Sequence, residues 1–219
     1  MTTTPIAPHI TAFLQQRLPL ERNASENTCE SYAYAFKLLF TYASDRLKVA
    51  PSALALEQLD ACLVSGFLNH LETTRGNGPT SRNTRLAAIR SFMRFMAYRV
   101  PSAMEQIQRV LAIPLKKADT RLVRHLTGDE MQAILNAPLP DHREGIRDRA
   151  MLHLCYAAGL RVSELVDLRL ADLTLQPQAS VLVHGKGRKE RCLPLWKETS
   201  SALRAWLAVR GDMRVPELF

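Results

Sequence analysis

The sequence predicts a mainly α-helical protein with a small β-hairpin, made of two parts joined by a basic linker. Three observations predict this fold class. Apolar residues recur at helical spacing through the first 100 residues. The segment TGDE at Thr127 has the signature of a helix start, and a second part begins there. Near the end of the chain, the segment VLVHGKGRKERCLPL (181–195) places two short apolar runs around a glycine-containing turn, which indicates a β-hairpin.

Helical periodicity divides the first part into successive helices. The expected helices are one from the N-cap Ser25 to about Leu47, one with apolar residues from Leu59 to Leu71, and one that begins near Ser81. The apolar stripe of the last helix consists of Leu86, Ile89, Met93 and Met96. A stripe of this kind is more often core than cofactor site, so we predict that it is buried.

The second part is expected to combine helices with the hairpin. Its elements are a helix capped by a Thr127–Glu130 capping box, a mostly buried helix ended by Gly159, a helix capped near Ser163, the hairpin, and an amphipathic helix from Glu198 to Val209. The stretch between the parts, from about Glu105 to Arg124, is irregular and broken by prolines. We therefore expect a helical domain over 1–105, a basic linker over 106–122 and a second domain over 123–219.

The positive charge is concentrated in one stretch. The chain has 29 basic and 21 acidic residues, for a net charge of +8. Ten of the basic residues and only two of the acidic ones lie between Arg82 and Arg124, so the rest of the chain is balanced. Charge confined to one region indicates a polyanion binder. The arginine-rich, proline-broken stretch favours nucleic acid over a membrane surface, although solubility remains the alternative for any single basic run.

The totals exclude several other classes. There is no run of 18 apolar residues and no secretory leader pattern in MTTTPIAPHI, so we expect a cytoplasmic protein. The four cysteines are far apart with no C-x-x-C pair, which argues against a metal site. The glycines near Lys186 do not satisfy G-x-x-x-x-G-K-[ST], so no nucleotide cofactor is expected.

Two cations stand out as candidates for phosphate chemistry. Arg161 lies at the junction between a glycine-terminated helix and the next helix, where its guanidinium could be presented rigidly to a phosphate. The alternative is that it merely pairs with a nearby carboxylate such as Glu164. Lys186 lies at the hairpin tip, and a lysine there could protonate a departing alkoxide.

The pairing of GLRVSEL with HGKGRKERCLPL resembles the tyrosine site-specific recombinases of the phage integrase family, most closely the Xer-like members. The segments SENTCESYAYAFKLLF and SRNTRLAAIRSFMRFM are similar to the core-binding domain of that family, and LTGDEM is similar to the entry of its catalytic domain. The resemblance therefore covers nearly the whole chain. It implies a four-helix, SAM-like core-binding domain followed by the N-terminal half of an α+β catalytic domain.

The resemblance also implies a function and a set of site residues. Members of the family close as a C-shaped clamp around duplex DNA, and a tyrosine attacks a phosphate to leave a 3′-phosphotyrosyl link. Arg161 then corresponds to the first catalytic arginine, and Lys186 to the hairpin lysine that protonates the 5′-oxygen. The expected DNA-binding residues are Arg82, Arg85, Arg90, Arg94, Lys116, Lys117, Arg121, Arg188 and Lys189. Duplex DNA, other recombinase protomers on DNA and no cofactor are the implied partners.

The chain departs from the family pattern after the hairpin. No histidine is followed three residues later by arginine, and all five tyrosines precede Lys186. Each of these tyrosines falls in an apolar helical pattern, so we predict packing roles for Tyr32, Tyr34, Tyr42, Tyr98 and Tyr156. We therefore expect a chain truncated partway through the catalytic domain, which contains no nucleophile and is inactive alone. The alternatives are a non-catalytic DNA-binding module that occupies recombination sites or joins an intact recombinase, and, with less support, a helix-turn-helix regulator.

Overall fold

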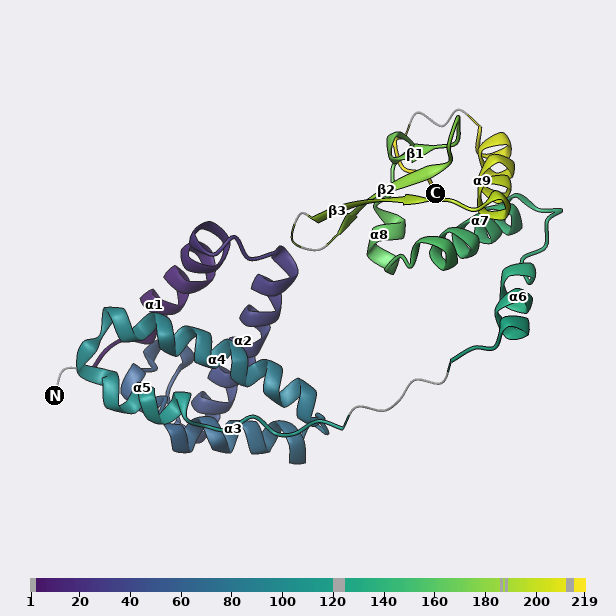
Figure 1. The fold of residues 1–219 in the computed structure, drawn as a ribbon. Helices are drawn as coiled ribbons and strands as arrows, with labels where there is room; N and C mark the ends of the chain where they lie inside the picture. Colours follow the sequence, from purple (N-terminus) through teal and green to yellow (C-terminus); the bar gives the residue numbers. More distant parts are fainter. Residues whose placement is uncertain (1–2, 120–124, 186, 188, 212–214) are drawn as a thin grey trace. The chain divides into compact units, whose positions relative to one another are not determined.

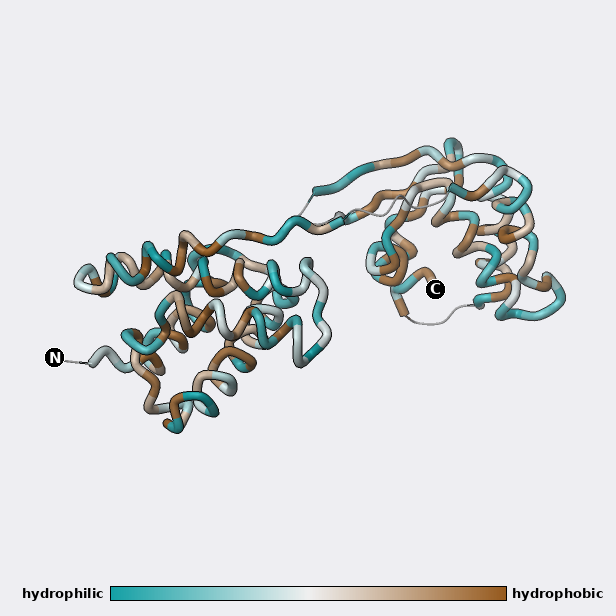
Figure 2. Tube along the Cα trace, turned by 90° about the horizontal axis from the view of Figure 1, so that it is seen from below, coloured by the Kyte–Doolittle hydropathy of each residue, from teal (hydrophilic) through white to brown (hydrophobic). Residues whose placement is uncertain are grey.

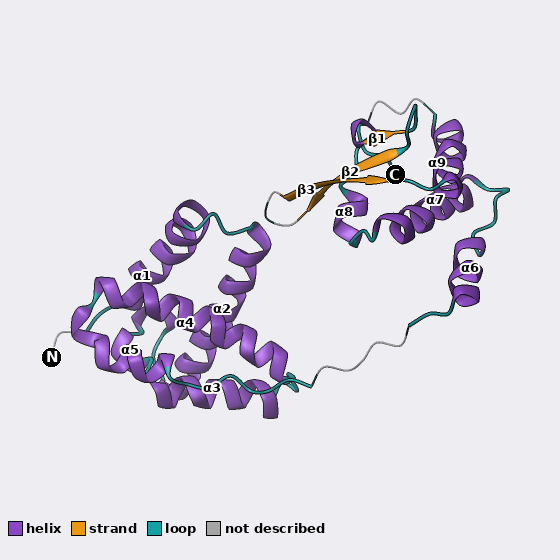
Figure 3. Ribbon diagram, in the orientation of Figure 1, coloured by secondary structure: helices purple, strands orange, loops and turns teal. Residues whose placement is uncertain are grey.

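The computed structural model describes residues 3–119, 125–185, 187, 189–211 and 215–219. The chain divides into two compact units, Met1–Arg121 and Leu122–Phe219 (Figure 1). In the part of the chain that the structure describes, all three strands belong to the second unit, and the first is helical (Figure 3). None of the described helices is long and apolar enough to cross a membrane.

The first unit is a bundle of helices around an aromatic core. Its main helices are α1 (Ile6–Ala12), the π-helical segment η1 (Phe13–Glu21), α2 (Glu26–Leu47), α3 (Ala61–Thr73), α4 (Pro79–Arg99) and α5 (Met104–Leu111). Short 3₁₀ turns η2 (Pro51–Ala53), η3 (Leu56–Gln58) and η4 (Pro101–Ala103) connect them. Apolar and polar residues are interspersed along the helical tube of this unit, as expected for helices that bury one face (Figure 2). The stripe Leu86, Ile89, Met93 and Met96 is fully buried, as predicted.

Four phenylalanines interlock at the centre of this unit. The ring of Phe13 lies 6.0 Å from that of Phe36 and 5.4 Å from that of Phe92, both at steep angles, and Phe95 packs beside it. Edge-to-face contacts of this kind add to the free energy of simple area burial. Because Phe13 belongs to η1, this cluster attaches the first helical segment to α2 and α4.

Two helices of the first unit lie where no helix was expected. The segment over residues 6–21 has no counterpart among the expected elements, because the wide turns of η1 and Pro19 within it break the 3.6-residue period that a sequence search detects. The expected irregular region from Glu105 begins instead as α5, whose Ile107 and Val110 are buried. The interpretation of this stretch as linker was therefore wrong up to Leu111; a helix of eight residues is too short to show a clear period.

The second unit places helices beside a three-stranded antiparallel sheet. Its elements are α6 (Gly128–Asn136), α7 (Arg143–Ala158), α8 (Val162–Val166), η5 (Leu170–Asp172), β1 (Leu173–Thr174), β2 (Ser180–Gly185), β3 (Lys189–Pro194) and α9 (Lys197–Arg210). The sheet order is β1-β2-β3. The Thr127–Glu130 capping box is present: the Glu130 amide donates to Thr127 Oγ1 at 3.2 Å, and the Thr127 amide donates to Glu130 Oε2 at 2.8 Å. The hairpin prediction is confirmed, with Val183 opposite Arg191 and Gly185 opposite Lys189.

The last residues of the chain pack into the second unit. Leu218 is fully buried, and its amide donates to the Leu168 carbonyl at 2.8 Å. The indole of Trp206 donates to the Leu218 carbonyl at 2.7 Å and its ring stacks on Phe219. The guanidinium of Arg210 donates to the carbonyls of residues 215 and 217. The apolar end of the sequence is therefore a core contact.

Candidate nucleic-acid interface

Arg161 lies in the three-residue connection between α7 and α8. Helix α7 ends at Ala158, and Gly159 follows with φ +57°, a left-handed conformation that glycine adopts without strain. Arg161 itself has extended backbone and is the residue that precedes α8. The expected cap near Ser163 was therefore placed two residues too late. The cap interaction comes from Glu164, whose carboxylate accepts from the Arg161 amide at 2.9 Å, and a carboxylate was not the residue type sought at a cap.

The carboxylate of Glu164 is the centre of the site. Its Oε1 accepts from Nη1 of Arg161 at 2.9 Å and from Nη1 of Arg191 at 3.1 Å. Its Oε2 accepts from the Arg161 amide and from Nη2 of Arg191, both at 2.9 Å. A carboxylate offers about four acceptor positions, so all of those on Glu164 are occupied. Two guanidinium groups share one carboxylate, and the cluster keeps one excess positive charge.

The same bonds hold Glu164 in its ionised form. The hydrogen bonds from Arg191 first, and then the Arg161 amide, lower the pKa of Glu164 to about 2, although its burial opposes this. A carboxylate with a lowered pKa stabilises the fold above its ordinary pKa of 4.5, and that contribution is lost as the pH falls toward 2. The cluster is therefore intact at neutral pH.

Arg161 pairs with a carboxylate, as the alternative interpretation expects, and its side chain still faces solvent. Its side chain is 70% exposed, whereas that of Glu164 is 5% exposed. Only Nη1 contacts Glu164; within the described ranges, Nε and Nη2 of Arg161 have no hydrogen-bond partner. A guanidinium anchored by one nitrogen, with its other N–H groups directed away from the anchor, can donate two parallel hydrogen bonds to a phosphate.

The base of the hairpin lies against this cluster. Lys186 and Arg188, the predicted residues of the tip, fall outside the described residues. Gly185, next to Lys186 in sequence, is so close to the cluster that a Cβ atom there would lie 3.3 Å from Nη1 of Arg191 and 3.5 Å from Oε1 of Glu164. Glu164 also binds Arg161, so one buried carboxylate joins the arginine to the residue that precedes the predicted lysine. Lys189, at the start of β3, is exposed.

A second ionic contact supports the same end of the hairpin. The ring of His184 is held between two carboxylates, with Nε2 3.1 Å from Asp172 Oδ1 and Nδ1 3.0 Å from Glu190 Oε1. The hydrogen bond to Asp172 first, and the one to Glu190 as well, raise the pKa of His184 above its usual 6.5. The imidazolium can donate to both carboxylates, whereas the neutral ring has only one N–H.

We expect the second unit to lose stability as the pH rises through the pKa of His184. A raised pKa in the folded state means that the contribution is complete below pH 6.5 and disappears above the folded-state value. Proton NMR titration of the His184 ring should give a midpoint above 6.5, and Asp172→Asn should lower it. A midpoint at or below the ordinary value would show that the two carboxylates do not hold the ring.

Four of the predicted DNA-binding residues of the first unit are engaged in internal contacts. Nη1 of Arg85 donates to the Ser31 carbonyl at 3.3 Å, and the other three contacts involve the segment after α5. Arg82 is 6% exposed, and its Nη1 donates to the Pro114 carbonyl at 3.2 Å. Arg90 donates to the Ile113 carbonyl. Lys116 is paired with Glu72 at 2.8 Å. These three side chains attach the segment after α5 to α3 and α4, and the geometry favours this structural role over a phosphate contact.

Asn83 completes this attachment. Its side-chain amide donates to the Lys116 carbonyl at 2.7 Å and its carbonyl accepts from the Lys116 amide at 3.0 Å. An asparagine side chain thus bonds the main chain as a neighbouring strand would. The segment after α5 therefore stays bonded to α4 as far as Lys116. Lys117, which follows, is exposed. Arg121 lies outside the described residues.

Arg85 and Arg94 lie on different faces of α4. They are nine residues apart, which is about two and a half helical turns, so their side chains point in opposite directions. The guanidinium of Arg85 lies 4.8 Å from the ring centroid of Tyr34, and Nη2 of Arg75 lies 3.5 Å from the Tyr34 hydroxyl. Basic side chains around an exposed aromatic ring suit a nucleic-acid surface. The sequence reasoning missed Tyr34 and Arg75, since the contact forms only between helices.

Three of the five tyrosines for which packing roles were predicted are exposed. Tyr34, Tyr98 and Tyr156 are 44%, 88% and 49% exposed. They follow the helical period, but they lie at the margin of the apolar stripe, where a large ring projects into solvent. Tyr156 packs edge-on against Trp196, at 5.9 Å between ring centroids.

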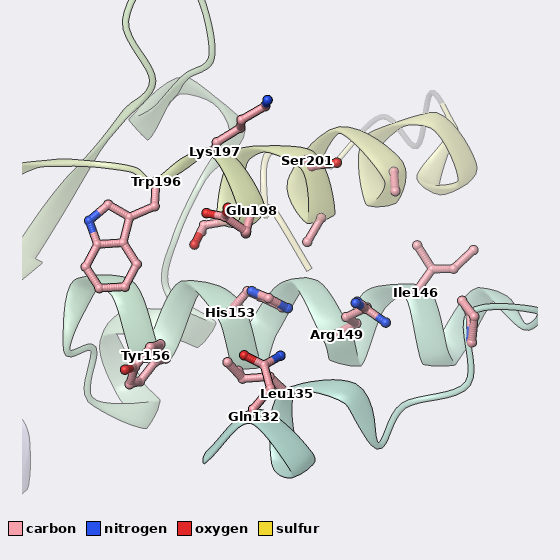
Figure 4. A pocket seen from close by; sticks show the side chains of 14 residues that line it. Gln132, Leu135, Ile146, Arg149, His153, Tyr156, Trp196, Lys197, Glu198 and Ser201 are labelled. Carbon is pink, nitrogen blue, oxygen red and sulfur yellow. The ribbon is translucent and has the colours of Figure 1, made fainter. Parts of the chain in front are cut away.

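A groove of the second unit lies away from the cluster around Glu164. This groove of about 730 Å³ runs between α6, α7 and α9, and its lining includes Gln132, Arg149, His153 and Trp196 (Figure 4). Arg161 is not among the lining residues. Burial, and then the charge of Arg149, lower the pKa of His153, so the ring is neutral at pH 7. The arginine cluster therefore does not belong to this groove.

Comparison with known proteins identifies the family. Residues 124–217 match the "Phage integrase family" and residues 10–99 match the "Phage integrase, N-terminal SAM-like domain". The integrase/recombinase y4rD of Sinorhizobium fredii is 41% identical over 207 residues, which cover 94% of this chain and 74% of that protein. The chain belongs to the phage integrase family of tyrosine recombinases. The resemblance in the GLRVSEL and HGKGRKERCLPL motifs is thereby confirmed.

Other relatives of this integrase chain agree. The integrase/recombinase y4rC of S. fredii is 44% identical over 212 residues, covering 96% of this chain and 64% of the relative. Tyrosine recombinase XerD of Haemophilus influenzae is 36% identical over 188 residues, which cover 86% of this chain and 60% of XerD. This chain thus spans less than two thirds of the length of these two relatives.

Solved structures confirm the integrase fold. The XerH site-specific recombinase bound to its palindromic difH substrate superposes with a TM-score of 0.67 at 22% identity, over 95% of this chain and 61% of that one. A lambda integrase dimer bound to a COC′ core site gives a TM-score of 0.69 at 17% identity, over 96% of this chain and 56% of that one. The predicted fold class, helical SAM-like first part and small antiparallel sheet included, is correct.

Proposed function

We propose that this integrase chain binds duplex DNA as part of site-specific recombination and integration, with Arg161 donating to a backbone phosphate. One observation carries the proposal. The guanidinium of Arg161 is fixed by a single nitrogen to a saturated, buried carboxylate, and the rest of its donors are exposed. The excess positive charge of the cluster favours an anionic ligand.

Further basic side chains would extend the contact along the duplex. We assign Arg85, Lys117, Arg121, Arg188 and Lys189 to backbone phosphates. Lys117 and Lys189 are exposed. Arg85 donates one N–H to the Ser31 carbonyl, but it lies with Arg75 at the exposed ring of Tyr34. Arg82, Arg90 and Lys116 instead hold the segment after α5 in place. Arg94 lies on the opposite face of α4 from Arg85, so one duplex does not use both.

Lys186 is proposed to protonate the 5′-oxygen that leaves when a tyrosine attacks the phosphate. The short link from Arg161 through Glu164 to Gly185 supports this role, because it brings the residue next to Lys186 toward the cluster. Related proteins support a role on DNA. XerH was crystallised with its difH substrate, and lambda integrase was crystallised as a tetramer on a Holliday junction. DNA and further recombinase protomers are therefore the proposed partners.

We expect the 219-residue chain to retard duplex DNA without forming a covalent adduct. Its tyrosines all precede the hairpin. Among the described residues, the hydrogen bonds of Arg161 go to Glu164 and to no tyrosine. Incubation with a nicked suicide duplex, followed by denaturing electrophoresis, measures the adduct, and a native gel measures binding. The Arg161→Ala variant, compared with Arg169→Ala as a matched exposed arginine, measures the contribution of the site. A band that survives denaturation would contradict the absence of a nucleophile, and equal binding of both variants would contradict the role of Arg161.

As a second candidate function, the chain would bind DNA beside an intact recombinase and contribute Arg161 and Lys186 to a shared active site. The preformed cluster favours it, since Arg161 is already held in the absence of DNA. Mixing the chain with a relative that retains its nucleophile but lacks its own first arginine distinguishes the two functions. Restored cleavage that disappears with Lys186→Ala supports shared sites, whereas inhibition alone supports simple occupation of the DNA.

A further inference from the structure

We propose that Arg191 is a positioning residue for Arg161: by occupying one acceptor site on each oxygen of Glu164, it prevents that carboxylate from capturing the whole guanidinium of Arg161. The inference rests on the proposed function and assigns a role within the same site. Arg191 would not touch DNA. It would determine how many donors of Arg161 remain for a phosphate.

Strand alternation directs Arg191 inward. Within β3, residues 190 and 192 are exposed, whereas Arg191 and Leu193 are partly covered on the opposite face. Arg191 also pairs across the sheet with the fully buried Val183. A basic residue at a position that packs against core valine requires an anionic partner. Glu164, 27 residues earlier on α8, is that partner.

The geometry of the contact is specific to arginine. Nη1 and Nη2 of Arg191 reach Oε1 and Oε2 of Glu164 at 3.1 and 2.9 Å, a side-by-side pairing that a planar guanidinium makes and a single ammonium does not. With Arg191 in place, each carboxylate oxygen has one site left. The Arg161 amide takes the site on Oε2 and its Nη1 takes the site on Oε1.

Removal of the two Arg191 donors would change which groups hydrogen-bond to Glu164. A buried carboxylate with vacant acceptor sites attracts any donor nearby, because an unsatisfied buried charge is costly. Among the described residues, Nη2 and Nε of Arg161 have no hydrogen bond, and they belong to a guanidinium that Glu164 already holds through Nη1. Arg161 would then pair with Glu164 through two nitrogens and would no longer present two donors to a phosphate. Its affinity for DNA would fall although its own sequence is unchanged.

The hairpin backbone takes part in the same arrangement. A Cβ atom at Gly185 would lie 3.1 Å from the Lys189 carbonyl and 3.3 Å from Nη1 of Arg191. Gly185→Ala would therefore displace the Arg191 fork without altering any charge. It provides a milder perturbation of the same contact, by steric means.

The test measures binding of the full chain to a fluorescent duplex at constant salt. Arg161→Ala is expected to weaken binding about tenfold, the size of one charged hydrogen bond. Arg191→Lys, which keeps the charge and loses the fork, should weaken it about as much, and Gly185→Ala by a smaller factor. Neither change should add to the loss in an Arg161→Ala background. Arg169→Lys, at an exposed arginine with no ion pair among the described residues, is the matched control and should bind as the unmodified chain does.

A rescue separates positioning from simple support of the fold. In Arg191→Lys/Glu164→Gln, the neutral amide no longer competes for the guanidinium of Arg161, so affinity should recover at least severalfold over Arg191→Lys. If Arg191 only supports the fold, the second substitution removes a further contact and affinity falls again. Circular dichroism shows whether each variant is folded. If Arg191→Lys does not fold, the binding of Gly185→Ala is the test instead.

The outcomes distinguish this inference from the proposed function. If Arg161→Ala weakens binding and Arg191→Lys does not, the positioning role is wrong and the phosphate contact stands. If Arg191→Lys weakens binding and Glu164→Gln in that background weakens it further, the positioning role is also wrong. If Arg161→Ala binds as the unmodified chain does, the proposed function of Arg161 fails and the inference fails with it.

Discussion

Raising the salt concentration from about 50 mM to about 200 mM is expected to weaken DNA binding by this chain roughly a thousandfold or more. Each phosphate that a lysine or arginine neutralises releases condensed counterions, and the logarithm of the affinity falls by about 0.9 per contact for each tenfold rise in salt. The proposed contacts of Arg161, Lys186 and the five backbone-binding residues are enough for a loss of this size. Fluorescence anisotropy over a series of salt concentrations measures the slope.

Single substitutions should divide the basic residues into two groups. Lys117→Ala and Lys189→Ala should each flatten the salt slope by about one contact. Arg82→Ala and Arg90→Ala should leave it unchanged, because these side chains are bonded to the carbonyls of residues 114 and 113. If Arg90→Ala flattens the slope as much as Lys189→Ala does, the internal role assigned to Arg90 is wrong.

Replacement of Trp206 by alanine is expected to lower the free energy of unfolding of the second unit by about 3–5 kcal/mol. Trp206 is 3% exposed and belongs to the core cluster with Leu203 and Leu218. Its indole donates at 2.7 Å to the Leu218 carbonyl and its ring stacks on Phe219. The substitution would therefore open a cavity and release the end of the chain from α9.

The chain provides its own control for this experiment. It has two tryptophans, and both lie in the second unit. Trp196 is 57% exposed, so Trp196→Ala should change stability by no more than about 0.5 kcal/mol. Each variant retains one indole, and its fluorescence during urea unfolding reports on the second unit alone. Equal losses in the two variants would contradict the packing of Trp206 described above.

The elements that sequence reasoning located well are those that bury one face over several turns. Helices α2, α4 and α9 and the β2–β3 hairpin follow from periodicity, because a long repeat leaves one way to bury its apolar residues. The segment over residues 6–21 and helix α5 were missed. The first contains π-helical turns, and the second is too short for a period to be visible.

The site was only partly predictable for a related reason. The residues of GLRVSEL indicated Arg161, and charge counting indicated the stretch from Arg82 to Arg124. Charge counting does not distinguish a cation that faces solvent from one that bonds a carbonyl, so Arg82 and Arg90 were grouped with Lys117 and Lys189. The period-two alternation of β3 was the signal for Arg191, since it shares a face with Leu193, but its partner lies on α8.

The amino-acid sequence by itself determined that the chain is helical, basic and an integrase relative, because propensity, periodicity and short motifs are local properties. Only the tertiary structure decided which cations are available to DNA. That depends on where buried carboxylates and main-chain carbonyls lie, and such groups come from segments far apart in the chain. Glu164 meets Arg191 across 27 residues, and Arg82 meets Pro114 across 32. The energy of a charge depends on its desolvation and its partners, and both are fixed only by the folded arrangement.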